Sequence, residues 1–449
     1  MGRRGKNGNL NKLNPEDRPV HDWYRFVLSF PPHLVRDYLA RFGISQDACV
    51  LDPFCGTGTT IVECQKHGIP SIGVEANPMA FLATMTKTDW SVDPQRLLDH
   101  AHLIADAALL ELRTHGIEDN PILLSGQHPT VPLRTLAPEQ MDLLLSDSIS
   151  PLPLHKTLVL LDVMQRDRDD RYYNHERLAL AKALVYLISN LHFGPEVGVS
   201  PPKQDAPVIS AWLCCVNAMA QDLRVIQHAT HMKAQVHRAD ARQLDSVLKP
   251  QSVDAVITSP PYPNEKDYTR TTRLESVLLG LINSKRDLQT LKRSLVRSNT
   301  RSVYRDDDDD RWILQYPEIH QIADAIEARR LELGKTSGFE RMYPRVTRLY
   351  FGGMARHLAQ LTTFLRPGAQ LAYVVGDQAS YLRIMIRTGK LLSDIATSLG
   401  YQLVATDLFR TRLATATGEQ LREEVVILRW PGKQSASRSH VKHKRKAIP

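Results

Sequence analysis

The stretch "VLDPFCGTGTT", residues 50–60, joins an apolar run to a glycine-rich turn. The turn is followed at once by "TTIVECQKHG" (59–68), which has the spacing of a helix that ends at Gly68. Glycines let a backbone come close to a ligand, and the start of a helix offers free amide groups. In a parallel sheet such a turn lies at the carboxyl edge, where nucleotides bind. The stretch therefore predicts a strand, a ligand-binding turn and a helix.

The residues around this turn limit the kind of ligand. A dinucleotide fingerprint requires a third glycine where this chain has Ile61, and a phosphate-binding loop requires a lysine that the turn lacks. Glu75 ends the next apolar run, where an acid commonly accepts hydrogen bonds from ribose hydroxyls. Gly56, Gly58 and Glu75 together favour a nucleoside ligand over the alternative of a tight turn beside a surface acid. Asp240, at the end of a later apolar run, is a weaker candidate for contact with an adenine amino group.

Strand and helix patterns alternate along much of the chain, which predicts an α/β fold with a doubly wound, Rossmann-like sheet. Helical spacing recurs at 356–365 and 389–400. Strand-like runs occupy 48–54, 70–76, 234–240, 253–259, 369–377 and 423–430.

Two segments interrupt this alternation, and both ends have the composition of solvated tails. We expect 91–230 to be a mostly helical insertion, and 263–345 to be a second insertion within the core. The core of the α/β fold is then 21–90 plus 231–432, between basic tails at 1–20 and 433–449.

Composition narrows the class of protein. The net charge of +8 suits a polyanionic partner, although many enzymes are mildly basic. The five cysteines are scattered and no CxxC pairs with a second cluster, which argues against structural zinc and suits a reducing compartment. The aspartate run 306–310 is expected to be a solvated loop, and we predict no metal. Because no apolar run is long enough to span a bilayer, we expect a soluble, cytoplasmic protein.

A second motif, "VDAVITSPPY" at 253–262, ends another strand-like run. Proline fixes φ and removes an amide donor, so this strand ends in a stiff loop. The Ser259 hydroxyl and the Pro260 carbonyl can accept the two hydrogens of an exocyclic amine, while Tyr262 can stack on a base swung out of a duplex. An exocyclic amine is a poor nucleophile, and two acceptors would hold it with its lone pair directed at a methyl donor. Such alignment lowers the barrier to transfer chiefly through orientation. The stretch "SPPK" at 200–203 follows a glycine-rich loop and lacks the tyrosine, so position distinguishes the two stretches.

"DPFCGTGTT" together with "TSPPY" resembles the S-adenosylmethionine-dependent DNA amino-methyltransferases, which methylate N4 of cytosine or N6 of adenine. The resemblance implies a seven-stranded class I methyltransferase sheet, S-adenosylmethionine as cofactor, and double-stranded DNA with a flipped target base as partner. It leaves both insertions, 91–230 and 263–345, as candidates for reading the DNA sequence, with 263–345 as the candidate DNA-recognition region. It also implies a set of site residues. Ser259, Pro260, Pro261 and Tyr262 hold the target base, Phe54, Gly56 and Gly58 line the methionine end of the cofactor, Glu75 holds its ribose, and Phe30, Pro31, Asp52 and Asp240 complete the cofactor site.

The choice of base is a separate prediction. In that family Ser-Pro-Pro-Tyr is typical of cytosine-N4 enzymes and Asp-Pro-Pro-Tyr of adenine-N6 enzymes, so N4 of cytosine is the leading prediction. Many cytosine-N4 enzymes place this loop before the glycine turn, whereas here the glycine turn comes first. Adenine-N6 methylation, an RNA-directed amino-methyltransferase and a catalytically silent DNA-binding subunit are the alternatives. A cognate restriction endonuclease is an expectation from the family.

Basic residues after the second motif are candidate phosphate ligands. Lys266, Arg270 and Arg273 follow it directly, and Arg293, Arg297 and Arg301 recur every four residues. For both groups a solvated helix face is an equal alternative.

Overall fold

The computed structural model describes residues 13–26, 29–119, 129–193, 196–227, 232, 234–264, 266–413 and 420–432. Its centre is a seven-stranded sheet with the strand order β5-β2-β1-β6-β7-β9-β8. The pairs from β5 through β7 are parallel, and β9 is antiparallel to both β7 and β8. The strands are β1 (Val50–Asp52), β2 (Ser71–Val74), β5 (Gln235–His237), β6 (Val253–Thr258), β7 (Leu365–Gly376), β8 (Gln402–Leu413) and β9 (Gln420–Arg429).

This topology confirms the predicted Rossmann-like, class I methyltransferase sheet. The chain runs outward from β1 to β2 and β5 on one side, and from β6 to β7 on the other. The strand order therefore reverses between β1 and β6, and the carboxyl ends of these two strands frame the crevice where α/β sheets bind ligands.

Helices cover both faces of the sheet, as a mainly parallel sheet requires. Ala255 and Ile257 of β6 pack in a core with α2 (Pro32–Arg41) and α3 (Thr59–Lys66). Val256 faces the opposite core, which includes α14 (Gly338–Leu361) and α15 (Thr388–Ser398).

Within the seven-stranded sheet, β8 is the strand that the sequence patterns do not indicate. It lies at the edge of the sheet, where Leu403, Val404 and Leu408 are exposed. Its apolar residues therefore do not form the continuous run of a buried strand. The helix expected at 356–365 also ends earlier, because α14 stops at Leu361 and β7 begins at Leu365.

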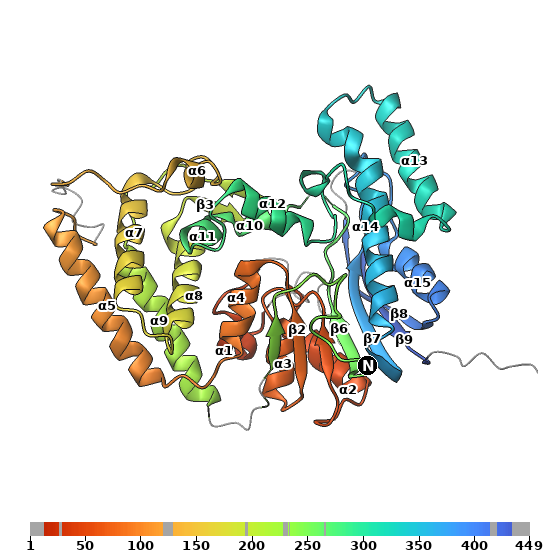
Figure 1. The fold of residues 1–449 in the computed structure, drawn as a ribbon, viewed down its shortest axis with the longest axis horizontal. Helices are drawn as coiled ribbons and strands as arrows, with labels where there is room; N and C mark the ends of the chain where they lie inside the picture. The colour runs from red at the N-terminus through yellow and green to blue at the C-terminus, as the bar shows by residue number, and fades with distance from the viewer. Residues whose placement is uncertain are drawn as a thin grey trace, which may run out of the picture.

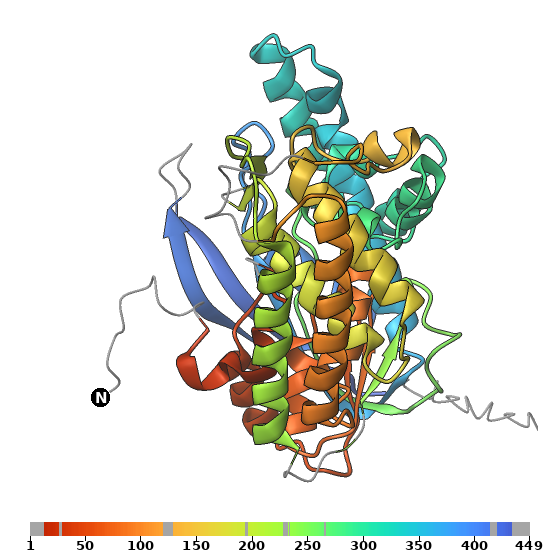
Figure 2. The same ribbon diagram turned by 90° about the vertical axis from the view of Figure 1, so that its left-hand side faces the viewer.

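A second layer of helices stands beside the sheet (Figures 1 and 2). Its core is a continuous cluster of buried residues, with Trp23 and Trp212 among the largest side chains. A hairpin of β3 (Leu191–Phe193) and β4 (Val197–Val199) joins the last two helices. The helices are α5 (Pro94–Thr114), α6 (Pro138–Met141), α7 (Pro151–Arg166), α8 (Tyr173–Ala183), which continues as a π-helical turn to Ile188, and α9 (Val208–Ile226).

Part of the expected N-terminal tail is packed rather than solvated. The 3₁₀ turn Pro15–Asp17 and α1 (Arg18–His21) follow each other directly. Asp17 and Val20 are buried, and Arg36 donates to Asp17 at 2.7 Å. A partly buried ion pair thus holds a segment whose composition resembles a tail. Residues 1–12 and the tail 433–449 lie outside the described residues.

Above the carboxyl edge of the sheet lie three short helices (Figure 1). They are α10 (Tyr268–Thr271), α11 (Arg273–Leu278) and α12 (Lys285–Arg293). The chain then passes through 3₁₀ turns at Thr300–Ser302 and Asp309–Ile313 to α13 (Pro317–Glu332) and α14. α4 (Pro78–Lys87) follows β2 on the same edge.

The aspartate run in this segment is not simply a solvated loop. Asp309 is buried and forms ion pairs with Arg242 and Arg356. Asp306 and Asp307 pair with Arg293 and Arg297, each at 2.7 Å. The like charges are tolerated because arginines on neighbouring elements neutralise them. The expectation of a solvated loop is therefore wrong for much of the run.

The ion pairs with Asp306 and Asp307 involve Arg293 and Arg297, which the sequence offered as candidate phosphate ligands. Because Arg293 and Arg297 already hold aspartates, they stabilise this insertion instead of presenting unpaired charge. Within the described ranges, no group of three or more possible ligand side chains is placed to hold a metal. None of the described helices combines the length and apolar character that crossing a membrane would need.

Candidate active site

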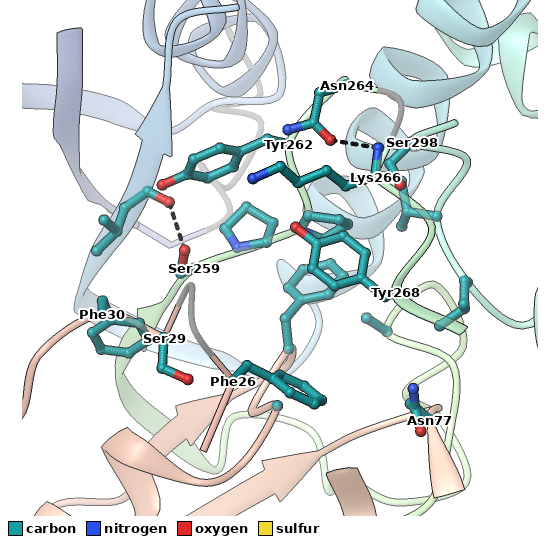
Figure 3. Close-up of a pocket in the computed structure, with 18 of the residues that line it drawn as sticks. Phe26, Ser29, Phe30, Asn77, Ser259, Tyr262, Asn264, Lys266, Tyr268 and Ser298 are labelled. Carbon is teal, nitrogen blue, oxygen red and sulfur yellow. Dashed lines mark hydrogen bonds between the residues drawn. The ribbon is translucent and has the colours of Figure 1, made fainter. Parts of the chain in front are cut away.

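A cavity of about 640 Å³ opens at the carboxyl ends of β1 and β6 and is lined by both predicted loops (Figure 3). Three of the predicted site residues are absent from its lining, namely Pro31, Asp52 and Gly58. The structure therefore brings most of the predicted set to one place. The predicted residues that line the cavity are Phe30, Phe54, Gly56, Glu75, Asp240, Ser259, Pro260, Pro261 and Tyr262.

The glycine turn depends on two left-handed residues. Gly56 has φ +52° and Gly58 has φ +86°, a region that favours glycine over residues with a Cβ. A Cβ at Gly56 would meet no atom within 4 Å, whereas one at Gly58 would lie 2.8 Å from Cγ2 of Thr84. Gly56 thus leaves open space beside the cavity. Gly58 instead closes the turn against α4 and begins α3.

Glu75 links this turn to the end of β2. Its carboxylate accepts hydrogen bonds from the backbone N–H of Gly56 at 2.8 Å and of Asn77 at 2.7 Å. Burial raises the pKa of Glu75 to about 7, although these two hydrogen bonds act in the opposite direction. Because a carboxylate has about four acceptor positions, it can still accept from a ligand hydroxyl.

Asp52 was predicted to belong to the cofactor site, but it does not line the cavity. It is fully buried and accepts from Oγ1 of Thr258 at 2.6 Å and from the N–H of Phe54 at 3.2 Å. Burial raises its pKa to about 6. Thr258 directly precedes the Ser-Pro-Pro-Tyr loop. Asp52 therefore ties together the two strand ends that carry the cavity walls.

The Ser-Pro-Pro-Tyr loop presents acceptors and a ring. Oγ of Ser259 donates its hydrogen to the carbonyl of Val374 at 3.1 Å. Since a hydroxyl has one hydrogen and two lone pairs, its remaining capacity is that of an acceptor. The loop then turns tightly, with the N–H of Asn264 bonded to the carbonyl of Tyr262 at 2.8 Å. Figure 3 shows Ser259 and Tyr262 at the cavity, with Lys266 beside them.

Asp240 lines the cavity as part of a buried ionic network. Arg242 donates to its carboxylate through the backbone N–H at 2.8 Å and through Nη2 at 2.7 Å. Arg242 also bonds to Asp309. Arg242 and Asp309 lie far apart in the sequence, so no local sequence pattern predicts that Asp309 holds Arg242 beside Asp240.

Several lining residues were not predicted from the sequence. Asn77 caps α4 by accepting from the N–H groups of Met79 and Ala80, and the pair Asn77-Pro78 is a helix-start signal that could have identified it. Phe409 and Arg410 belong to β8, which the sequence patterns do not indicate, so they could not be placed from the sequence. The unpredicted lining residues include Phe26, Ser29, Asn77, Tyr268, Gln378, Phe409, Arg410, Leu421 and Glu423.

The fold and the cavity together define the class of protein. The seven-stranded sheet, with a glycine turn and an acid at the ends of neighbouring strands, is that of a class I methyltransferase.

Comparison with known proteins narrows this class. The model of the N6/N4 methyltransferase family, described as DNA methylase, matches residues 6–85. The type II methyltransferase M.BsoBI of Geobacillus stearothermophilus is 26% identical over 92% of this chain and 85% of that protein. The type II methyltransferase M.AvaI of Nostoc sp. is 23% identical over 86% of this chain and 80% of that protein. These findings confirm the resemblance to the DNA amino-methyltransferases of the N4/N6 family, without distinguishing the two bases.

A solved structure also matches. TrmN from Thermus thermophilus is 12% identical, with a TM-score of 0.28. The match covers 89% of this chain but only 48% of that one, so the chain spans about half the length of the solved protein.

Proposed function

We propose that this protein transfers a methyl group from S-adenosylmethionine to N4 of cytosine in double-stranded DNA. The observation that carries the proposal is that Ser259–Tyr262 and the Gly56 turn line one cavity. A methyl donor held at the turn and an amine held at the loop would then meet across a single space. The serine in place of aspartate at position 259 favours cytosine.

The residues around the turn suit S-adenosylmethionine. Gly56 leaves open space, and the half-buried carboxylate of Glu75 retains acceptor capacity for ribose hydroxyls. Phe30 and Phe54 add apolar surface to the same wall. When bound, the cofactor supplies an electrophilic methyl group on a sulfonium.

The loop residues would prepare the amine. An exocyclic amine is a weak nucleophile because its lone pair is delocalised into the ring. If its two hydrogens are accepted by the Ser259 hydroxyl and the Pro260 carbonyl, the lone pair can point towards the methyl group. Tyr262 would stack on the extruded base. With the cofactor bound at the turn, its methyl group would pass to the amine held by Ser259 and Pro260, leaving a neutral thioether, and the amine would release one proton to solvent.

Further parts of the proposal concern partners. The relatives are named type II methyltransferases, which supports a cognate restriction endonuclease acting at the same DNA site. We assign sequence reading to the segment 263–345, because α10 to α12 stand above the carboxyl edge of the sheet (Figure 1) and Lys266, Tyr268 and Ser294 of this segment line the cavity.

Adenine N6 is the second candidate. The observation in its favour is the order of the two motifs, since the glycine turn precedes the Ser-Pro-Pro-Tyr loop in this chain. Both bases offer an exocyclic amine, so the machinery described would serve either.

One experiment tests the proposal. The protein is incubated with radiolabelled S-adenosylmethionine and unmethylated DNA, and the digested nucleosides are separated. We expect label in N4-methylcytosine, and its loss in Tyr262→Ala while cofactor binding is retained, because the ring touches the base and not the cofactor. Label in N6-methyladenine would show that adenine is the target base instead of cytosine. Label only in RNA would show that RNA is the substrate instead of DNA. A folded, cofactor-binding protein that transfers to neither would be a silent DNA-binding subunit.

A further inference from the structure

The cavity has a wall that the functions assigned above do not use. Strands β8 and β9 contribute Arg410 and Glu423 to its lining. These two residues are directly paired in the antiparallel register. Nε and Nη2 of Arg410 both donate to the Glu423 carboxylate, the latter at 3.0 Å. Both side chains are largely buried, at 20% and 9% exposed, so the guanidinium is held in one orientation.

This pair lies next to the ring of Tyr262, which is proposed above to stack on the target base. Gly376 of β7 is in register with Glu423. A Cβ at Gly376 would lie 2.9 Å from Cε2 of Tyr262 and 3.4 Å from Cγ of Glu423. Tyr262 and Glu423 therefore flank the same glycine, and a base stacked on Tyr262 would have the ion pair at its edge.

The distance to Ser259 also fits a single base. Strand β9 is two places from β6 in the sheet, which corresponds to about 10 Å between backbones. A pyrimidine ring with a hydrogen bond of about 2.9 Å at either end spans a length of this order. Ser259 and the ion pair can thus contact opposite ends of one base.

The free hydrogens of Arg410 define what it can recognise. Because Glu423 occupies Nε and one hydrogen of Nη2, the outer fork of Nη1 and Nη2 is left for a ligand. No residue in the described part of the chain accepts a hydrogen bond from Nη1. A cytosine whose amine is at Ser259 offers N3 and O2 as two adjacent acceptors. An adenine in that position offers N1 and then a C–H group.

We propose that Arg410, oriented by Glu423, donates to O2 and N3 of the extruded cytosine and is a specificity-determining residue. This inference rests on the proposed function, because it concerns the target base of the same site. It also gives a physical reason for cytosine that is independent of Ser259. The rivals are a purely structural cross-strand pair and a contact with a DNA phosphate.

A double-mutant cycle between protein and DNA separates these roles. The methylated position is first mapped on plasmid DNA. Oligonucleotides then carry at that position either cytosine or an aminopyridine nucleoside, which keeps the amine and ring nitrogen but lacks O2. Wild type and Arg410→Met are compared on both substrates by kcat/KM for methyl transfer.

We expect wild type to lose roughly 10- to 100-fold on the analogue, and Arg410→Met to lose at least that factor on cytosine, because it removes the contacts to both O2 and N3. On the analogue, Arg410→Met should lose clearly less than it does on cytosine, because only the contact to N3 is left to remove. A structural or phosphate role predicts that the two losses multiply, and this result would overturn the inference.

Matched variants control for folding. Arg422→Met removes an arginine that pairs with Glu424 in β9 but does not line the cavity. It should leave kcat/KM unchanged on both substrates. If Arg410→Met does not fold, Arg410→Lys keeps the charge without the fork and should show the same non-additive pattern. Wild-type transfer to adenine would overturn both proposals. Wild-type transfer to cytosine with multiplying losses would overturn only the role of Arg410.

Discussion

The chain contains Ser-Pro-Pro twice, and the two copies have different surroundings. Ser200 follows the small hairpin, where its N–H donates to the carbonyl of Asn190 at 2.7 Å and its hydroxyl contacts the His192 ring at 3.2 Å. The prolines after it are exposed. Ser259 instead ends β6 at the point where the strand order reverses, and Pro260 after it is buried. The tripeptide stiffens both loops. Position at the sheet edge, opposite the glycine turn, makes one of them a candidate site.

The same substitution in both copies gives the strongest test of this contrast. Ser259→Ala should lower kcat for methyl transfer on the order of 100-fold, the loss typical of removing one oriented hydrogen bond to a reacting group. Ser200→Ala should leave kcat unchanged, because that hydroxyl lies outside the cavity lining. Steady-state kinetics with equal DNA substrates measures both. Equal losses in the two variants would contradict the assignment of the catalytic loop.

Sequence could predict the parts of this site that rest on local patterns. The runs at β1 and β6 are apolar because both strands are buried, and each is followed by a turn whose residue types reveal its chemistry. This was enough to indicate Gly56, Glu75 and Ser259.

Other parts depend on contacts between distant residues. Asp52 stands in a motif associated with the cofactor, yet its carboxylate faces Thr258, a contact made only after folding. Arg242 reaches Asp309 across 67 positions, so the role of the aspartate run could not be derived locally. Arg410 belongs to an edge strand whose exposed residues hide the strand pattern.

The glycine turn that lies opposite Ser259 can be tested through Glu75. Its pKa of about 7 in the folded protein lies above the ordinary value of 4.5. A ribose hydroxyl donates to the ionised form, so the affinity for S-adenosylhomocysteine should rise with pH through about 7 and then level off. Glu75→Gln should bind roughly 10- to 100-fold more weakly at pH 8, because it loses a hydrogen bond to a charged acceptor. Titration calorimetry at several pH values measures this.

The stability of the cofactor-free protein should fall as pH rises, whereas its affinity for the cofactor product should increase. For a carboxyl whose folded pKa is raised, the contribution to stability is full below pH 4.5 and declines as pH rises to about 7. Glu75→Gln should therefore be more resistant to denaturant at pH 8 than wild type.

Glu275 provides the matched control. Burial also raises its pKa to about 7, but it bonds to Tyr24 and does not line the cavity. Glu275→Gln should keep the pH dependence of cofactor affinity. If it abolished that dependence, Glu75 would not be the titrating group.

The smallest expected effect concerns the surface beneath Tyr262. Gly376 does not need a left-handed conformation, but a Cβ there would come within 2.9 Å of the Tyr262 ring. Gly376→Ala should therefore displace the ring and lower kcat/KM about 10-fold, a loss of the size that a small misplacement of a reacting group produces. Cofactor affinity should stay unchanged. Gly338→Ala, at a position with nothing within 4 Å, is the control.

A double mutant decides whether Gly376 acts through the ring. In the Tyr262→Ala background the added methyl group of Gly376→Ala has no ring to displace, so it should cost nothing further. A further 10-fold loss would mean that Gly376 supports the strand itself. The position of the Tyr262 ring would then be set by the loop itself and not by its contact with Gly376.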